Sequence, residues 1–471
     1  MAVQHEPSRQ ARPGQTVGPC QSAPLTALII AVIAFAVQQT SIVPAVSDVQ
    51  AALHGSAEWS AWLVTVYLIV ATVGTPAMGR LADLYGRRKL LLIGLGVFAA
   101  ASIGAALAPN MVVLICWRAV QGVGGAVYPL ALSIARDQTP PEQVEKRVSA
   151  LTIAFGIGTA VGFVGGGLLA EYLSWRWIFV AGAVLVALAA GLVRRRVPVV
   201  EASASGRFDF RGAVILAVAA IALLSALTLV VPYGWASPAA VIPLVIAAAA
   251  GASWVIAERR TPDPLVDLHV LGERRVAIAN LSTIGLGWTL FAGYLLIPRF
   301  SQTLPARAHY GLGAGSAITG LLLLPLAAGQ VAAAAGAPPL SRHLHARLVF
   351  AAGLVLMTSG LAILTATRHS AVEMAVAAAV LGLGAGLALE TTSTIATEGV
   401  ASDVAAVSSA VNSTVRRLAG GIGGQVSTIV LAGLVIDGGG SPRFAAFVVC
   451  YAIAGAMCLG GALLSLVAMP A

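Results

Sequence analysis

Two charged residues lie inside long apolar segments of this sequence. Arg118 stands in the run 115–122, and Glu390 stands in the run 387–392. A charge well inside a membrane span costs about 3 kcal/mol, so such residues usually face a cavity or a partner. A carboxyl group in a low-dielectric environment can also hold a proton. We predict that Arg118 has a functional or gating role and that Glu390 is a proton site; the alternatives are a structural arginine that reaches toward the membrane surface, a cation-binding Glu390, and a structural pair of Glu390 with an arginine.

Uncharged polar residues recur inside two other apolar segments. Gln38, Gln39 and Thr40 put hydrogen-bonding groups into the first segment. Asn412 and Arg416 lie four residues apart, which places them on one face of a helix. We predict that these five residues contact a substrate.

Aromatic residues at helical spacing form a further candidate surface. Trp288, Phe291 and Tyr294 follow one another within a single apolar segment. They could line the same cavity, although aromatic residues at such spacing more often serve packing.

The segment 148–170 is rich in glycine. Small residues at four-residue spacing allow helices to approach closely. We predict that this helix is a tight pivot between two halves of the protein, a role that plain helix packing would itself provide. The glycines are Gly156, Gly158, Gly162, Gly165, Gly166 and Gly167.

A short polar hairpin at residues 79–89 separates two apolar segments. Gly79 and Gly86 permit close backbone approach and a tight turn. Asp83 lies within reach of Arg87 or Arg88. The spacing alone fits a conformational latch and a simple orienting loop equally well.

Membrane helices are the elements that must position these residues. The chain has 471 residues, of which 58% are hydrophobic and 10% are charged, and its mean hydropathy is +0.90. An ordinary soluble domain is about 25% charged. The net charge of +9 comes from basic residues in short loops, so it indicates orientation in a bilayer rather than nucleic-acid binding.

Soluble-enzyme chemistry has no signature in this sequence. There is no phosphate-binding loop, no serine nucleophile motif and no His or Cys cluster at metal spacing. Uphill transport would therefore draw on an ion gradient or on a separate subunit. We expect no enzymatic activity, cofactor, metal or disulfide framework; the four cysteines are Cys20, Cys116, Cys450 and Cys458.

Apolar runs of about 20 residues predict fourteen spanning helices. The first run is too long for the core of a signal peptide and follows a polar stretch of 24 residues. The predicted spans are 25–46, 60–79, 90–108, 111–135, 148–170, 177–193, 211–231, 239–257, 276–299, 314–336, 347–366, 373–396, 405–430 and 444–467.

The distribution of basic residues predicts the orientation of these helices. With the amino terminus inside, 20 of the 28 basic residues fall in cytoplasmic segments, 5 in outer segments and 3 within helices. This bias fits the positive-inside rule. Both termini are therefore predicted to be cytoplasmic.

A weak internal repeat suggests two related halves. Residues 340–347 follow the rhythm of residues 81–88, and both stretches come after the second helix of a six-helix set. Two parallel halves around a central site are a known plan for transporters.

The hairpin and three other stretches resemble the major facilitator superfamily. Residues 79–89 resemble the family's loop between helices two and three. Arg118 with Gln121 and Gly122 resembles its arginine motif, and residues 158–167 resemble its antiporter motif. The helix count and residues 175–179 resemble the branch of fourteen-helix drug:proton antiporters.

The resemblance extends over residues 25–467 and implies the fold and its divisions. We expect an all-α membrane protein with two six-helix bundles and two inserted central helices. The expected parts are a cytoplasmic tail (1–24), an N-terminal bundle (25–193), an inserted pair with its loops (194–275) and a C-terminal bundle (276–471).

The resemblance also implies roles for individual residues. Asp83 and its basic neighbours would latch the cytoplasmic side, Arg118 would assist proton coupling, and Gln121 would lie beside the substrate. The glycines of the fifth helix, Gly158, Gly162, Gly166 and Gly167, would favour export.

Four positions depart from the family pattern, among them His345, which stands at the second glycine of the second hairpin. Gln38 stands where this branch usually has an aspartate, and Phe163 replaces the proline of the antiporter motif. In the second hairpin, the acidic position is Arg342. Proton coupling would then depend more heavily on Glu390.

These features predict a secondary transporter of the cell membrane that exports amphipathic small molecules in exchange for protons by alternating access. A facilitator or importer of a neutral solute is the alternative, and a membrane-embedded enzyme or sensor is a remote third. The expected partners are the lipid bilayer, protons and a small-molecule substrate, with no nucleic acid. The family resemblance implies a monomer.

Overall fold

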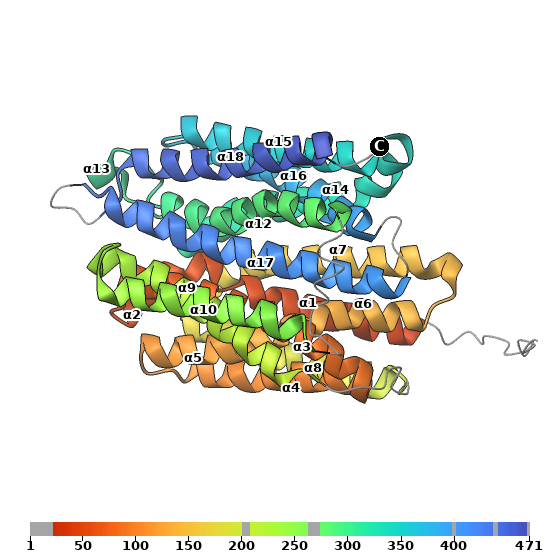
Figure 1. Ribbon diagram of the computed structural model, residues 1–471. Helices are drawn as coiled ribbons and strands as arrows, with labels where there is room; N and C mark the ends of the chain where they lie inside the picture. The colour runs from red at the N-terminus through yellow and green to blue at the C-terminus, as the bar shows by residue number, and fades with distance from the viewer. Residues whose placement is uncertain (1–21, 200–207, 262–273, 398–401, 437–440, 469–471) are drawn as a thin grey trace, which may run out of the picture.

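The computed structural model describes residues 22–199, 208–261, 274–397, 402–436 and 441–468. Within these residues the protein is built from helices, with one isolated β-bridge between Val435 and Pro442. The helices run nearly side by side, in one direction or its opposite, as Figure 1 shows.

The N-terminal half consists of α1 (Ser22–Thr40), η1 (Val43–Ala45), α2 (Val46–Ala52), α3 (Ala57–Tyr85), α4 (Arg87–Ala106), α5 (Met111–Gly122), η2 (Val123–Ala126), α6 (Val127–Asp137), α7 (Pro141–Tyr172) and α8 (Trp175–Arg196). Then come α9 (Phe210–Tyr233) and α10 (Pro238–Glu258). The C-terminal half consists of α12 (Arg274–Ser301), α13 (Pro305–Ala308), α14 (Ser316–His343), α15 (Ala346–Ala366), α16 (Ala371–Thr397), α17 (Ser402–Gly433) and α18 (Phe444–Ala468).

Each predicted span coincides with a helix or with consecutive helical turns. Thirteen stretches of the described chain are long and apolar enough to cross a membrane. The element outside that set is α17, which carries Arg416 and Arg417 together with many small and polar residues. It is 32 residues long and runs beside the other spans (Figure 1), so it supplies the fourteenth crossing.

The fourth predicted span is a helix with a short 3₁₀ segment inside it. The turn η2 separates α5 from α6 and contains Gly124 and Gly125. A Cβ atom at Gly122 would lie 2.8 Å from the carbonyl oxygen of Tyr67, and one at Gly125 would lie 2.6 Å from the Ala71 side chain. Glycine is needed here because α3 approaches the backbone of this span directly.

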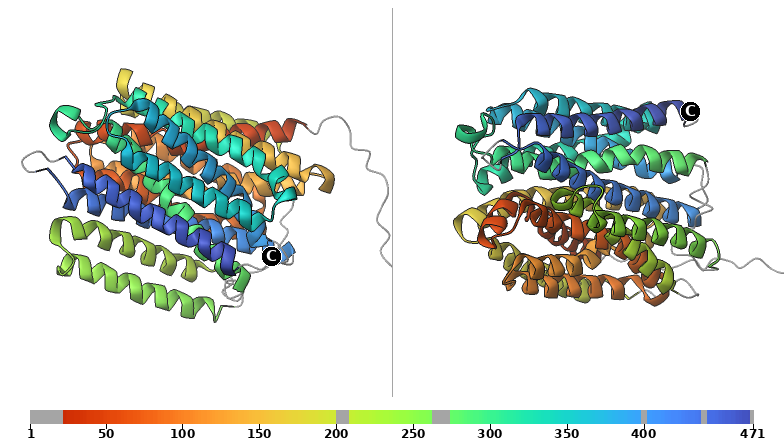
Figure 2. Two further views of the ribbon diagram at one scale, coloured as in Figure 1. Left: turned by 90° about the horizontal axis from the view of Figure 1, so that it is seen from above. Right: turned by 60° about the vertical axis from the view of Figure 1, so that its left-hand side comes forward.

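The helices form two bundles that face each other. Figures 1 and 2 show α12, α14, α15, α16 and α18 on one side and α1 with α3 to α8 on the other, with α17 between them. The two bundles meet where α7 packs against α14 and where α17 packs against α3. When α5 and α6 are counted as one span and α17 is counted with the C-terminal helices, each bundle has six spans. With α9 and α10 added, this is the predicted architecture, and the structure confirms it.

The inserted pair lies at one edge of the seam between the bundles (Figure 2). The helices α9 and α10 pack against each other, and α9 also packs against α3 and α17. Only 11% of the most apolar stretch of α10 is buried inside the protein. The side chains of α10 therefore mostly face lipid.

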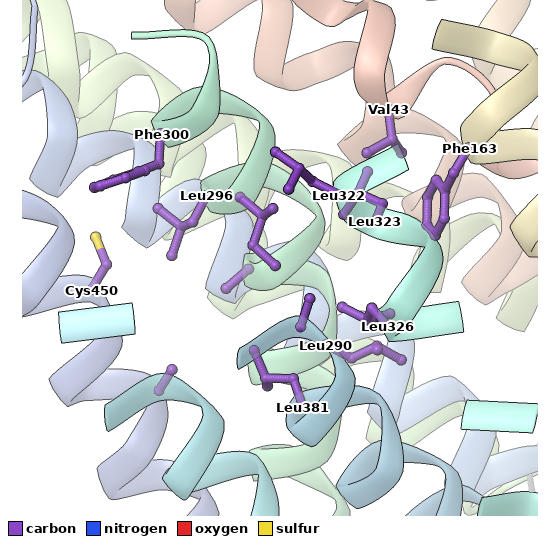
Figure 3. Close-up of a cluster of buried hydrophobic side chains, with 14 of the residues drawn as sticks. Val43, Phe163, Leu290, Leu296, Phe300, Leu322, Leu323, Leu326, Leu381 and Cys450 are labelled. Atoms are coloured by element: carbon purple, nitrogen blue, oxygen red, sulfur yellow. The ribbon is translucent and has the colours of Figure 1, made fainter. Parts of the chain in front are cut away.

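Apolar side chains from both bundles merge into one core. Figure 3 shows Val43 and Phe163 of the N-terminal half beside the leucines of α12 and α14. Phe163, which replaces the family's proline, is fully buried in this core. The core therefore couples the two halves through direct packing.

Candidate functional site

A buried hydrogen-bonded chain surrounds Arg118 in the N-terminal bundle. The Arg118 Nη1 atom donates to Gln121 Oε1 at 2.7 Å, and Gln121 Nε2 donates to Ser102 Oγ at 2.8 Å. Gln38 Nε2 reaches the same hydroxyl at 3.4 Å. The network therefore joins α1, α4 and α5, and it brings three of the predicted site residues together.

Neutral groups complete the surroundings of Arg118. Its Nε atom donates to the carbonyl oxygen of Leu63 at 2.9 Å, and the guanidinium lies 4.9 Å from the centre of the Tyr67 ring. Among the described residues, no carboxylate pairs with Arg118, which is 1% exposed. A carbonyl dipole, an amide and an aromatic face therefore stabilise this buried charge.

Of the three polar residues at the end of α1, two are buried against neighbouring helices. Gln38 is buried against Gly182 of α8, where an added Cβ would collide with the Gln38 amide. Thr40 donates to carbonyl oxygens of Ala36 and Thr159. Gln39 is partly exposed. Gln38 therefore belongs to the network of Arg118, and Gln39 is the most accessible of the three.

A second buried polar cluster lies in the C-terminal bundle around Asn412. Its Oδ1 atom accepts from Thr392 at 3.3 Å and from Thr283 at 3.5 Å, while its Nδ2 atom donates to Asn280 Oδ1 at 3.1 Å. Asn412 is 2% exposed. This cluster ties α12, α16 and α17 together, so Asn412 acts chiefly as a buried link between helices.

Tyr128 lies across the seam between the bundles from two charged residues, Arg416 and Glu390. The Tyr128 hydroxyl lies within electrostatic reach of both charged residues, although Tyr128 belongs to α6 and the others belong to α16 and α17. All three side chains are partly exposed. The structure thus brings together two residues for which the sequence predicted different roles.

Arg417 crosses the seam directly. Its Nη1 atom donates to the carbonyl oxygen of Ala71 at 3.1 Å and also to the Thr75 hydroxyl, and Nη2 donates to the carbonyl oxygen of Gly125 at 3.4 Å. These acceptors lie on α3 and η2 of the opposite bundle. The α17 residue that holds the two bundles together is therefore the neighbour of the predicted Arg416.

Two aromatic residues of α12 have different neighbours: one contacts the opposite bundle and the other packs inside its own bundle. Tyr294 contacts Phe163 of α7 edge to face, with ring centres 5.4 Å apart, and its hydroxyl accepts from Gln330 at 3.5 Å. Trp288 packs over Gly423 of α17, where a Cβ would lie 2.9 Å from the indole ring. Tyr294 thus joins the two bundles, whereas Trp288 fills space between α12 and α17.

The hairpin at 79–89 is held by an ion-pair network. Gly86, with φ of +97°, ends α3 and starts α4. Arg87 bridges Asp83 at 3.1 Å and Asp137 of α6 at 2.5 Å, and Arg88 donates to the carbonyl oxygen of Arg194. Every one of these contacts lies within the N-terminal bundle. A Cβ at Gly79 would meet open space, so close approach does not require glycine there.

The predicted pivot glycines face two different helices. A Cβ at Gly158, Gly162 or Gly166 would collide with the backbone of α1 or of the residue that follows it, whereas one at Gly167 would collide with Ser316 of α14. Three of these glycines therefore pack α7 within its own bundle, and Gly167 faces the other bundle.

Polar contacts also join the bundles at the end that carries α2 and α13. Ser316 Oγ donates to Asp48 Oδ2, and the backbone N–H of Ala317 donates to Glu171 Oε2 at 2.8 Å. Gln302 Nε2 donates to the carbonyl oxygen of Pro44 at 2.8 Å. Glu171 of one half thus caps the first turn of α14 in the other half, and Asp48 binds a side-chain hydroxyl on the same turn.

Comparisons with known proteins identify the family. A sequence profile described as the Major Facilitator Superfamily matches residues 28–424. The chain belongs to the major facilitator superfamily. It is therefore a multi-pass membrane transporter rather than an enzyme, as the sequence predicted.

Curated relatives in this superfamily include resistance proteins. The chain is 31% identical to the multidrug resistance protein Stp of Mycobacterium tuberculosis strain CDC 1551 over 82% of its own length and 72% of that protein. It is 30% identical to multidrug resistance protein 3 of Bacillus subtilis, over 64% of this chain and 58% of that protein. It is 32% identical to a lincomycin resistance protein of Streptomyces lincolnensis, over 59% of this chain and 58% of that protein.

Solved structures agree on the fold. The xylose transporter XylE from E. coli, in a partially occluded inward-open conformation, superposes with a TM-score of 0.65 at 14% identity, covering 96% of this chain and 98% of that one. A mutant of the nucleoside transporter NupG gives a TM-score of 0.66 at 13% identity, covering 95% and 100%. At this identity, these superfamily members support the fold alone.

The sequence did not predict several residues that make polar contacts between helices far apart in the chain. Asp137, Arg417, Asp48 and Glu171 all make the contacts described above, and none of them was predicted. Arg417 stood beside a predicted residue, and its charge inside a helix was the available signal. The acids gave no comparable signal because they lie near helix ends, where charges are ordinary. Within the described residues, no group of three His, Cys, Asp or Glu side chains could hold a metal ion.

Proposed function

We propose that this protein exports amphipathic small molecules, such as drugs, antibiotics or metabolites, across the cell membrane in exchange for protons. The observation that carries the proposal is the 31% identity to a multidrug resistance protein over 82% of the chain. The similarity to a lincomycin resistance protein supports the same direction of transport. The protein would work as a monomer with both termini in the cytoplasm.

The contacts between the bundles support a mechanism of alternating access. At the predicted outer end, Asp48 and Glu171 hold the start of α14. These hydrogen bonds would break when the outer end opens and form again when it closes. Such polar contacts are suited to a gate because each contributes about 1.5–3 kcal/mol in net terms, little enough to be broken and formed again in each cycle.

The charged residues of the seam support proton coupling. Glu390 would carry the proton, because it is partly exposed and lies close to Tyr128 of the other bundle. Arg118 would act through its network rather than by direct contact with the proton. Its described partners are Leu63, Gln121 and Tyr67, all of them uncharged.

The hairpin would serve as a conformational latch on the cytoplasmic side. Asp83 orients Arg87, which in turn reaches Asp137. Replacing Asp83 with Asn should lower the maximal rate of transport more than the apparent affinity, since the residue lies away from Arg416 and Glu390. A substrate titration of transport in proteoliposomes measures both quantities, and an unchanged maximal rate would contradict the latch.

Flux in proteoliposomes tests the proposed function. Purified full-length protein would be reconstituted and loaded with candidate compounds, with and without an imposed pH gradient. We expect movement of substrate against its own gradient only while the pH gradient is present. Uphill transport that persists after a protonophore collapses the gradient would refute proton exchange.

A facilitator of a neutral solute is the second candidate function. The observation in its favour is Gln38, a neutral buried side chain at a position where related antiporters usually have an acid. Downhill flux of a neutral compound without any accompanying proton movement, measured with a pH-sensitive dye inside the vesicles, would favour this candidate.

A further inference from the structure

We propose that Arg416 binds an anionic group of the substrate, so that the transported compounds are amphipathic organic anions such as aromatic carboxylates. This inference rests on the proposed export function and specifies its substrate class. Its basis is the contacts of Arg416, compared with those of the two other arginines inside apolar helices, Arg118 and Arg417.

Arg416 is a cation with no bonded partner in the part of the chain that the structure describes. It makes no hydrogen bond and no ion pair there, and its electrostatic neighbours are Arg417 and Tyr128. In contrast, Arg118 donates two hydrogen bonds and Arg417 donates three. Arg416 therefore keeps all five of its N–H groups available to a ligand.

The position of Arg416 raises the free-energy cost of a charge without a bonded partner. It lies near the midpoint of α17, about 21 Å along the helix from Ser402 at 1.5 Å per residue. A charge at such depth in a membrane protein usually faces a partner or a water-filled space. The side chain is partly exposed, so the charge is not sealed inside the protein.

The charges around Arg416 favour an anion over a cation. Arg417 is adjacent, and it shares the neighbour Tyr67 with Arg118. One acid, Glu390, lies near the same Tyr128 that Arg416 faces. A cationic compound would be repelled by more than one guanidinium group, whereas a carboxylate would find a planar fork of donors suited to it.

Apolar surface next to Arg416 accounts for the amphipathic part of the ligand. Gly420 lies one helical turn after Arg416 on the same face of α17, and the Phe291 ring packs against it. Phe291 also contacts Tyr294, with ring centres 5.7 Å apart. An aromatic acid could therefore place its carboxylate at Arg416 and its ring near Phe291.

Binding of matched compounds to the purified full-length protein tests the inference without any gradient. The probes are a panel of naphthalene and biphenyl carboxylates, their methyl esters, and the amines of the same ring systems. We expect the carboxylates to bind about 10- to 100-fold more tightly than the esters, as befits a hydrogen-bonded ion pair, and the amines to bind most weakly.

Substitutions at Arg416 assign the preference to this residue. Arg416→Gln should remove the advantage of carboxylates over esters, and Arg416→Lys should retain part of it. Arg195→Gln is the matched control, because Arg195 is exposed at the cytoplasmic end of α8 and its loss should leave the preference unchanged. Gel filtration of each variant checks that the fold is intact.

Three results of the binding experiments would overturn the inference. They are tighter binding of the amines, a carboxylate preference that survives in Arg416→Gln, and binding of none of the panel to folded protein. Proton-driven export of cationic compounds would reject the anionic class and leave the proposed function standing. Carboxylate binding without any proton-driven flux would support the anionic substrate class and reject the proposed proton-driven export.

Discussion

At the scale of single residues, buried charges are stabilised by neutral partners. Arg118 relies on the Leu63 carbonyl, the Gln121 amide and the ring of Tyr67. Gln121 is the central member, because it joins Arg118 to Ser102 through its two ends. Loss of one partner in such a network leaves other buried groups unsatisfied.

Replacing Gln121 with Leu should therefore destabilise the protein. The change removes the acceptor of a charged donor, and a lost bond of this kind costs about 1.5–3 kcal/mol. Thermal unfolding in detergent, followed by tryptophan fluorescence, should show a lower midpoint. Gln39→Leu is the matched control, since Gln39 is partly exposed and makes no described hydrogen bond. Equal midpoints for the two variants would contradict this account.

Glu390 is the residue whose replacement should separate transport from proton movement. Glu390→Gln keeps the size of the side chain and removes the titrating group, so uphill transport driven by a pH gradient should fall at least tenfold, a change that corresponds to about 1.4 kcal/mol. Counterflow of substrate, which needs no net proton movement, should persist. Glu373→Gln, at the exposed start of the same helix, should behave like the unmodified protein. Full proton-driven activity in Glu390→Gln would remove this residue from the mechanism.

At the scale of elements, glycine decides how closely α7 approaches its neighbours. The backbone of α1 and of Ser41 just beyond it passes directly against Gly158, Gly162 and Gly166, which are spaced by one helical turn. A side chain at these positions would meet main-chain atoms, which cannot rotate out of the way. The contact therefore depends on the absence of side chains.

Adjacent glycines of α7 should respond very differently to alanine. A Cβ at Gly166 would collide with the Ser41 backbone, whereas a Cβ at Gly165 would meet no atom within 4 Å. Gly166→Ala should cost about 1–3 kcal/mol through overpacking, and Gly165→Ala should be neutral or slightly stabilising. Thermal unfolding of the two variants measures the difference, and equal midpoints would show that α1 yields easily.

The helices and their contacts also show how much of this structure could be predicted from the sequence. Hydropathy accounts for thirteen of the spans, since a helix of about 20 apolar residues reflects the thickness of the bilayer. The signal is weaker for α17, which carries two arginines and many small and polar residues. Hydropathy also located Arg118, Glu390 and Arg416, because charges in apolar runs stand out. It could not pair Asp48 with Ser316, which are 268 positions apart, or direct Arg417 to α3. Such contacts depend on how two bundles meet, and no local pattern records this.

At the scale of the whole molecule, the two bundles are joined in two zones. One zone is the predicted outer end, where Asp48 and Glu171 hold α14. The other is the middle of α17, where Arg417 donates to α3 and η2. Any large change of shape in this protein must rearrange one zone or the other.

Weakening the outer zone should open it. Glu171→Gln removes the charge that caps the first turn of α14, an interaction worth about 0.3–1 kcal/mol or somewhat more when partly buried. Spin labels at Leu173 and Leu304, both exposed at this end, would report the separation of the bundles. We expect a larger population of long distances than in the labelled parent. Glu373→Gln provides the control, and identical distance distributions would exclude a gating role for Glu171.

The line where α7 meets α14 has a kinetic consequence. There the backbones touch: a Cβ at Gly167 would reach Ser316, and one at Gly320 would reach the Phe163 carbonyl. At these two positions no side chain separates the two helix backbones, so the helices can shift against each other there more easily than where side chains interlock. The surrounding lipid, which must deform as the helices tilt, then contributes to the barrier together with the hydrogen bonds of the two zones. We therefore expect turnover to vary with the acyl-chain length of the bilayer, with a maximum where its thickness matches the apolar length of α7 and α14.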